Sequence, residues 1–109
     1  MALADVGNGT QTATIGTEHT LGTITTGKTC VLTVDLNAMA AGDTLELRAK
    51  VKVLTGSTAR EAYLETFTGD QTQDVFISIP VPARWSVAFT LKQTAGTGRA
   101  YDFTILSID

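Results

Sequence analysis

The 109-residue sequence is poor in the residues from which most metal and catalytic sites are built. Its one cysteine, Cys30, cannot form an intrachain disulfide, and its one histidine, His19, leaves too few ligands for a zinc site of Cys and His. With 2 prolines and 17% charged residues, the composition differs from that of disordered chains, which are highly charged or rich in proline. These shortages predict a folded domain that holds no metal and no cofactor.

Charge and hydropathy disfavour two further classes of protein. The net charge of −3 argues against a nucleic-acid-binding protein, which normally carries a basic surplus. No apolar run approaches the ~20 residues that a membrane-spanning helix needs. The first residues contain neither a basic segment nor a long apolar one, so we expect no signal peptide. The single cysteine indicates synthesis in a reducing cytoplasm or a chain that is indifferent to redox.

The chain is instead rich in threonine, with 20 residues, and apolar and polar side chains alternate along much of its length. Residues 44–54 show this pattern most clearly, because apolar positions alternate there with charged ones. The apolar positions are Leu45, Leu47, Ala49, Val51 and Val53. Successive side chains of a strand point to opposite faces, so the segment predicts a half-buried strand with a charged outer face. Threonine, which is β-branched, suits the outer faces of such strands.

The same alternation predicts strands at residues 29–36, 60–68, 74–79, 85–93 and 99–108, with weaker candidates at 10–15 and 20–25. In the segment 74–79, Val75, Ile77 and Ile79 share one face. About eight short strands joined by glycine-containing turns indicate an all-β protein, an antiparallel β-sandwich of jelly-roll-like arrangement. An immunoglobulin-like sandwich is the alternative, although it typically uses seven strands.

Two segments depart from this pattern. Residues 1–9 precede the first predicted strand, and we interpret them as a flexible arm before a single domain of residues 10–109, with a frayed terminus as the alternative. The exposed apolar candidates for an interface with another protein are Leu3, Val6 and Ile15. Asn37 is positioned to cap a single helical turn, which Gly42 would end.

His19 and Cys30 are the first candidates for catalysis. All four serines lie outside a Gly-x-Ser-x-Gly motif, so a Ser-His site is disfavoured and His19 is interpreted as a solvated loop residue. Cys30 lies on the apolar side of a predicted strand, which indicates a small buried hydrophobic residue rather than a nucleophile.

Acidic residues offer no better candidate. Glu61 and Glu65 are predicted on one face of a strand and could form an acid–base pair, but such a pair is more commonly a solvated face. Asp70 and Asp74 flank a turn without the ligand spacing of a calcium loop. The Gly-Thr-Gly at residues 96–98 lacks the remaining residues of a nucleotide-binding motif and predicts a hairpin tip. We therefore expect the protein not to be an enzyme.

Two groups of residues remain as candidates for binding at the surface. Arg48, Lys50 and Lys52 form a basic stripe, for which we favour a solubilising outer face over anion or nucleic-acid binding. Trp85 and Tyr63 could form a platform on which sugars stack. Trp85 also continues the apolar face of the segment 85–93, which favours a position in the core or at its edge.

Two stretches of the chain resemble a known family. Residues 35–48, ending in Thr-Leu-Glu-Leu-Arg, and residues 91–99, containing Thr-Ala-Gly-Thr-Gly-Arg, are similar to a family of small β-rich proteins encoded among the virion genes of tailed bacteriophages. With the order of elements between them, the resemblance covers residues 17–108. It implies a structural protein associated with the virion.

Within that class, the chain is similar in length and architecture to the cement or decoration proteins of capsids. The resemblance thus implies a protein that is made in the host bacterial cytoplasm and binds the major capsid protein on the capsid surface. It also implies a homo-oligomer, a trimer, with no nucleic-acid or membrane partner. The alternatives are a carbohydrate-binding module for host attachment and a component of the tail or neck.

Overall fold

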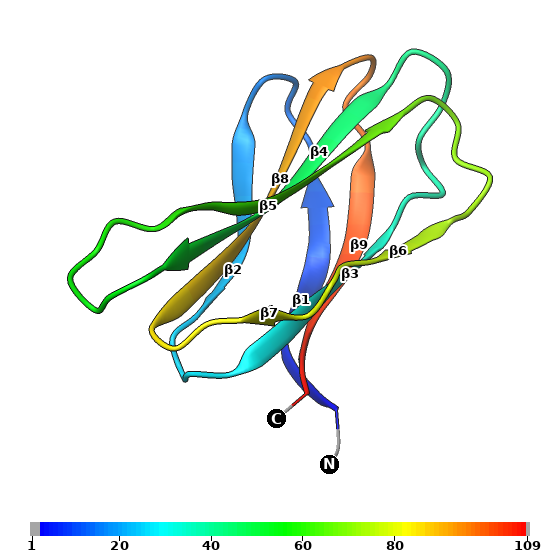
Figure 1. The fold of residues 1–109 in the computed structure, drawn as a ribbon. Coiled ribbons are helices and arrows are strands. Elements are labelled where there is room, and N and C mark those ends of the chain that lie inside the picture. Colours follow the sequence, from blue (N-terminus) through cyan, green and yellow to red (C-terminus); the bar gives the residue numbers. More distant parts are fainter. Residues whose placement is uncertain (1–2, 109) are drawn as a thin grey trace.

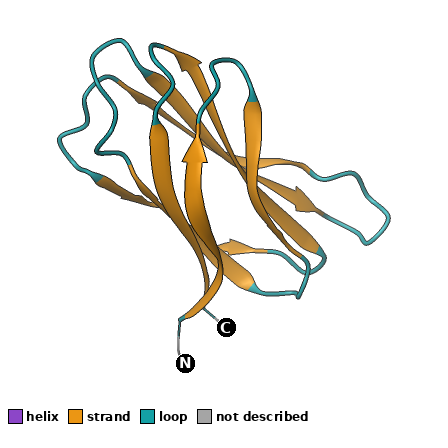
Figure 2. Cartoon of the chain, turned by 180° about the vertical axis from the view of Figure 1, so that it is seen from behind, coloured by secondary structure: helices purple, strands orange, loops and turns teal. Residues whose placement is uncertain are grey.

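The alternating pattern forms nine β-strands and no helix within residues 3–108, the part of the chain that the computed structural model describes (Figure 1). One sheet, sheet A, has the strand order β1 (Ala4–Thr12), β9 (Ala100–Ser107), β3 (Thr29–Asp35) and β6 (Val75–Ile77), with the short β7 (Val81–Pro82) also paired with β3. The other, sheet B, has the order β2 (Glu18–Ile24), β8 (Ser86–Ala95), β4 (Thr44–Lys52) and β5 (Arg60–Thr68). The two antiparallel sheets pack face to face (Figure 2), which confirms the predicted all-β sandwich.

The strand pairs are nested along the chain. β1 pairs with β9, β2 with β8, β3 with β6 and β4 with β5. As a result, β1 and β2 form one edge of the sandwich, while β5 and β6 form the other. The first and last described residues lie together at one end of the molecule (Figure 1). Within the described residues, no helix has the length and hydrophobicity needed to cross a membrane.

The core lies between the sheets and is built from alternate residues of the central strands. Each of these side chains is at most 2% exposed, and burial of one such aliphatic or aromatic group stabilises the fold by roughly 1.5–3 kcal/mol. The core residues of the four central strands are Cys30, Leu32, Val34, Leu45, Leu47, Ala49, Val87, Phe89, Leu91, Tyr101 and Ile105.

The central residues of the predicted strands agree with the structure, but several strand ends differ. β5 has the predicted bounds, whereas β4 ends at Lys52, so that Val53 is 78% exposed in the following loop. Trp85 precedes β8 instead of opening it. The inner face of β8 continues at its other end to Gln93, which is 0% exposed.

The first strand also differs from the prediction. Residues 4–9, expected to form an arm, belong to β1, in which Ala4 pairs with Ser107 and Gly9 with Phe103. The strand predicted at residues 10–15 is therefore the second half of a longer one that ends at Thr12. Met1 and Ala2, the rest of the expected arm, lie outside the described residues. The helical turn predicted after Asn37 is replaced by two short turns.

β6 turns its predicted apolar face toward solvent. Val75, Ile77 and Ile79 are 46%, 66% and 54% exposed, while Phe76 packs against the core. The rings of Phe76 and Phe67 meet edge to face with centroids 5.0 Å apart. Because one aromatic side chain buries more apolar surface than an aliphatic one, Phe76 sets the orientation of this short edge strand.

Candidate functional site

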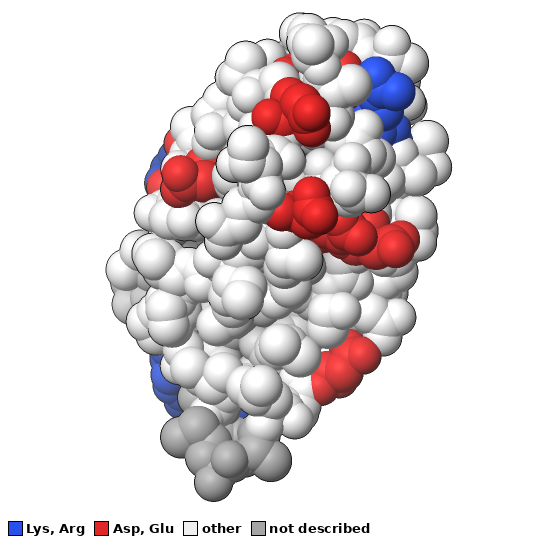
Figure 3. Space-filling model, turned by 90° about the vertical axis from the view of Figure 1, so that its right-hand side faces the viewer, with Lys and Arg blue, Asp and Glu red and all other residues white. Residues whose placement is uncertain are grey.

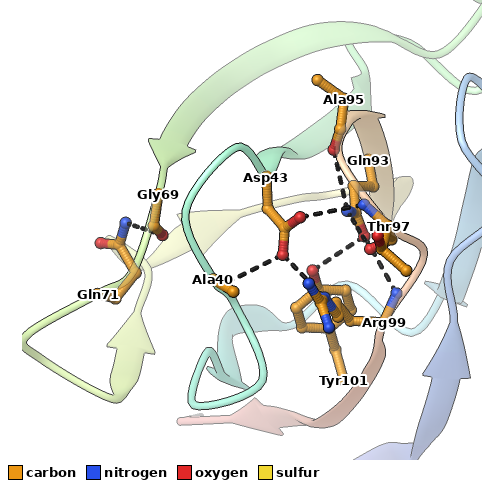
Figure 4. Close-up of polar contacts among 9 residues, drawn as sticks. All are labelled: Ala40, Asp43, Gly69, Gln71, Gln93, Ala95, Thr97, Arg99 and Tyr101. Atoms are coloured by element: carbon orange, nitrogen blue, oxygen red, sulfur yellow. Dashed lines mark hydrogen bonds and ion pairs between the residues drawn. The ribbon is translucent and has the colours of Figure 1, made fainter.

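A buried polar cluster lies where the loop before β4 meets the loop between β8 and β9 (Figure 4). We call it the corner cluster, and its members are Asp43, Gln93, Arg99 and Tyr101. Asp43 is 1% exposed, and its Oδ2 accepts hydrogen bonds from the Ala40 backbone N–H at 3.0 Å and from Arg99 Nε at 2.9 Å. Its Oδ1 accepts from the Thr97 backbone N–H at 3.1 Å. The carboxylate therefore ties two loops together.

Gln93 completes the corner cluster from the inner face of β8. Its Nε2 donates to the backbone carbonyls of Ala95, at 3.0 Å, and Thr97, at 2.7 Å. Its Oε1 accepts from the Tyr101 hydroxyl at 3.0 Å and from the Arg99 backbone N–H at 3.2 Å. A buried amide that makes both its donor and its acceptor bonds is stabilising, whereas an unsatisfied one costs about 1–3 kcal/mol.

The protonation states of the corner cluster are fixed at neutral pH. Burial raises the pKa of Asp43, but hydrogen bonds from Ala40, Arg99 and Thr97 outweigh it and hold the pKa below its usual value. Burial and the neighbouring Asp43 raise the pKa of Tyr101 to about 12. Neither group exchanges a proton near pH 7, so the cluster is suited to holding the two loops rather than to acid–base chemistry.

Gly96 allows the loop between β8 and β9 to approach the corner cluster. Its φ of +89° lies in the left-handed region, and a Cβ there would lie 2.7 Å from the Asp43 Cα and collide with the Asp43 carboxylate. Residues 96–98 lie between β8 and β9, but these strands belong to different sheets and do not pair, so the predicted hairpin tip is a loop that crosses from sheet B to sheet A. The two stretches that carry the family resemblance thus meet at one place in the structure, through Asp43 from the first and Thr97 and Arg99 from the second.

A second polar cluster covers the outer face of sheet B, and we call it the charged face. Arg48 forms ion pairs with Glu46 at 2.6 Å and Glu61 at 2.7 Å, and Lys50 forms one with Glu18 at 2.9 Å. Burial lowers the pKa of Arg48, but the two glutamates outweigh it and raise the pKa overall. Hydrogen bonds from Thr90 and Lys50 lower the pKa of Glu18.

These ion pairs change the interpretation of the predicted basic stripe. Arg48 faces Glu46 of its own strand and Glu61 of the neighbouring β5, and Lys50 faces Glu18 of β2 across β8, so their charges are largely compensated within the chain. Among the described residues, Lys52 has no ion pair. The stripe is therefore part of a mixed-charge outer face.

The two predicted glutamates lie on opposite faces of β5. The register shifts between Ala49 and Lys50, which pair with Tyr63 and Glu61, so that Ala62 is an extra residue in the strand. Glu61 consequently reaches Arg48 on the charged face, whereas Glu65 accepts a hydrogen bond from the Tyr63 hydroxyl at 2.9 Å. The prediction that both glutamates share a face was wrong because this β-bulge is not encoded in the alternation.

His19 and Cys30 have separate environments. His19 lies in β2, not in a loop as predicted, and its Nε2 accepts a hydrogen bond from the Thr14 backbone N–H at 3.1 Å. Cys30 is 0% exposed in the core, as its interpretation as a buried hydrophobic residue predicted. In the part of the chain that the structure describes, no three His, Cys, Asp or Glu residues are grouped as metal ligands would be.

The aromatic candidates lie on different elements. Trp85 is half-buried before β8 and is not part of the core, and the Arg84 guanidinium lies over its ring, 4.5 Å from the centroid. Tyr63 lies on β5, and burial and its bond to Glu65 raise the pKa of its hydroxyl. The arginine already occupies one face of the tryptophan, which is the kind of face on which a sugar would stack.

The predicted interface residues are divided between two ends of β1. Leu3 and Val6, which are 65% and 36% exposed, lie at its beginning, and Ile15, 42% exposed, follows its end. β1 continues for six residues beyond Val6, roughly 20 Å, and Ile15 lies past its end in a turn. They therefore do not form one patch.

The outer face of sheet A differs from the charged face. The described strands of sheet A contain no Lys or Arg, while Asp5, Asp35 and Asp102 are exposed on them. Seen from the side of β6, the molecule has a broad uncharged area with scattered acidic groups, and basic groups only near the margins of the view (Figure 3). The exposed Ile77 belongs to this side, where it pairs with Thr33 of β3, and the exposed Ile79 follows β6.

A pocket of about 260 Å³ opens beside β6, at the end of β5. Its apolar lining is formed by Leu36, Phe67, Val75, Phe76 and Ile77, and Gln71 and Gln73 add polar groups. Sequence patterns did not predict this pocket or the corner cluster. The one sequence signal for the corner cluster was Gln93, a polar residue at the position where the alternation of Phe89 and Leu91 predicts an inward-facing side chain.

Comparison with known proteins adds no relative. No protein-family model, no curated protein and no solved structure matches the chain.

Proposed function

We propose that this chain is a structural protein of a tailed-bacteriophage virion, a non-enzymatic decoration protein that binds the major capsid protein as a trimer. The proposal starts from the resemblance of residues 35–48 and 91–99 to virion proteins. These two stretches meet in the corner cluster through hydrogen bonds to Asp43, which supports a role for them in fixing the scaffold.

The nested strand pairing supports a jelly roll, the architecture expected of such a protein. A jelly roll has eight strands in two sheets. Without the two-residue β7, the eight longer strands form four nested antiparallel pairs, two in each sheet.

The strongest support for a binding function is the outer face of sheet A. Its edge strand β6 exposes Val75 and Ile77, and Ile79 is exposed just after that strand. The strands of the sheet carry Asp residues and no Lys or Arg. Contiguous exposed apolar groups at a protein surface commonly mark an interaction site. The partner that fits this face has an apolar surface bordered by basic residues, and we assign that role to the capsid protein.

The mechanism is thermodynamic linkage. A protein that binds only the assembled shell lowers the free energy of that state relative to its dissociated subunits, and so raises the temperature at which the shell opens. No reaction step is required, and the decoration protein would act from the capsid surface after its synthesis in the host cytoplasm.

Mass spectrometry of purified particles of the phage that encodes this chain tests the proposal. We expect the protein in numbers comparable to those of capsomers, and particles stripped of it should release DNA at a lower temperature. Absence from the particle would overturn the virion assignment. Only a few copies per particle would overturn the capsid role in favour of the tail or neck.

A matched pair of variants tests the docking face. Ile79→Lys places a charge at one of the exposed apolar positions, and we expect at least about a tenfold loss of affinity for stripped capsids. Leu64→Lys places the same charge on an equally accessible leucine of β5, 41% exposed, and should bind as the unaltered protein does. Equal binding by both variants would contradict docking through sheet A.

A further inference from the structure

The loop between β4 and β5 exposes two large apolar side chains at its beginning. Val53 is 78% exposed and Leu54 is 64% exposed, and the rest of the loop, through Ala59, contains no charged residue. The β4–β5 loop projects beyond the body of the sandwich in both ribbon views (Figures 1 and 2). We call Val53 and Leu54 the apolar tip. Exposure of two such side chains to water costs free energy unless they are buried in a complex.

The pocket lies at the opposite end of the same strand. β5 runs from Arg60, next to the projecting loop, to Thr68, next to the pocket-lining Phe67. A nine-residue strand is roughly 30 Å long, so the tip cannot reach the pocket of its own chain.

The size and lining of the pocket fit an aliphatic side chain. Its volume of about 260 Å³ is below the ~300–1,000 Å³ of typical small-molecule sites. Phe67, Val75 and Ile77 contribute apolar surface, and no charged residue lines it. One or two aliphatic side chains from a protein would occupy such a space.

Charges around the tip and the pocket are complementary. Lys52 and Arg60 flank the projecting loop, while Asp70 and Asp74 lie in the loop that borders the pocket. Within residues 3–108, none of these four side chains has an ion pair. The two cations beside the apolar tip are thus opposite in charge to the two carboxylates beside the apolar pocket at the other end of β5.

We propose that the Val53–Leu54 tip of one copy of this chain docks in the β5–β6 pocket of a second copy. Because the two surfaces differ, the contact is heterologous, and repetition of it generates a ring or a filament. The inference deepens the proposed homo-oligomer by naming its contact, and it rests on the proposed function only for the expectation that the ring closes at three subunits.

Complementation between two variants tests the contact in the isolated protein. Leu54→Asp disables the tip and Val75→Asp disables the pocket, and both positions are exposed enough to accept a carboxylate without unfolding. By analytical ultracentrifugation we expect the unaltered protein to associate and each variant alone to be monomeric, with self-association weakened about 10- to 100-fold. An equimolar mixture should form a heterodimer and nothing larger, because one functional tip and one functional pocket remain.

The other outcomes are equally informative. Leu64→Asp, a control on the exposed side of β5, should associate as the unaltered protein does, and circular dichroism verifies that each variant is folded. A monomeric unaltered protein, variants that still associate alone, or a mixture that stays monomeric would overturn the contact. Capsid binding without self-association would overturn this contact alone, whereas self-association without any capsid binding would overturn the proposed function and leave the contact standing.

Discussion

The corner cluster and the charged face contain the same kinds of group but differ in their exposure to water. Asp43 in the corner cluster is 1% exposed and makes three hydrogen bonds, two of them to backbone N–H groups of loops. On the charged face, Lys50 and Glu18 are 34% and 31% exposed and pair across strands that the sheet already holds together. Both regions are polar networks, yet only one of them determines where a loop lies.

The difference teaches that burial, not the number of ion pairs, decides how much a polar network contributes to the free energy of unfolding. Removing one partner of a buried pair leaves an uncompensated charge and unsatisfied N–H groups, which costs several kcal/mol. Removing one partner of an exposed pair lets water take its place, which costs about 0–1 kcal/mol. We therefore expect the two regions to respond very differently to equivalent substitutions.

Asp43→Ala should have the largest effect. It removes the acceptor of the Ala40 and Thr97 N–H groups and the partner of Arg99, and we expect a loss of about 3–5 kcal/mol of unfolding free energy. Urea unfolding at pH 7 measures it. Asp102→Ala, which removes an exposed aspartate that accepts from the Thr10 hydroxyl, should change stability by less than about 1 kcal/mol. Similar losses for both would contradict the distinction.

Gly96→Ala should have the next largest effect on stability. Its comparison with Gly42→Ala separates the cost of backbone strain from the cost of steric crowding. Gly42 has nearly the same φ, +92° against +89°, but open space around it, so Gly42→Ala should cost only about 1–2 kcal/mol for the left-handed backbone. Gly96→Ala should cost a further ~1–3 kcal/mol, because its Cβ would displace Asp43. Thermal unfolding of both variants compares them. Equal costs would mean that the loop between β8 and β9 does not press on the corner cluster.

The contrast between the two regions also explains what the sequence predicted. The bounds of β5 and the inner positions of β4 follow from alternation. A strand that buries one face must place its apolar residues at every second position. The charged face follows from the same rule. Its ion-pair partners do not, since they depend on strand order and on the extra residue Ala62, which moves Glu61 to the other face.

The corner cluster was beyond prediction for a different reason. Asp43 and Arg99 are 56 residues apart, and their contact depends on how two loops close over the end of the sandwich. Similarly, the orientation of β6 depends on whether Phe76 finds Phe67, a contact between two sheets. Alternation indicates which residues share a face, but long-range packing selects the face that is buried.

The pH dependence of stability offers a third test of the buried region. Because the folded-state pKa of Asp43 is lowered, its ionised form contributes stability that is fully present above the unfolded pKa, near 4, and is lost as pH falls through the folded pKa. The stability difference between the unaltered protein and Asp43→Asn should therefore be largest above pH 5 and shrink as the pH falls below about 4 toward the lowered folded-state pKa. Urea unfolding across this range measures it. Gly42→Ala, destabilised without a change in titration, should show a constant difference, and a constant difference for Asp43→Asn would contradict the ionic role.

The smallest effect should come from the charged face, through the pair of Lys50 and Glu18. A double-mutant cycle of Lys50→Met and Glu18→Gln should give a coupling energy of only about 0.2–1 kcal/mol, which 1 M salt should largely remove by screening. Lys52→Met is the matched control, a lysine of the same strand and parity that lies opposite Ser86 and has no ion pair among the described residues, and it should show no coupling to Glu18→Gln. A salt-insensitive coupling of several kcal/mol between Lys50 and Glu18 would mean that the charged face behaves as a buried network, because only desolvated charges interact that strongly at this separation.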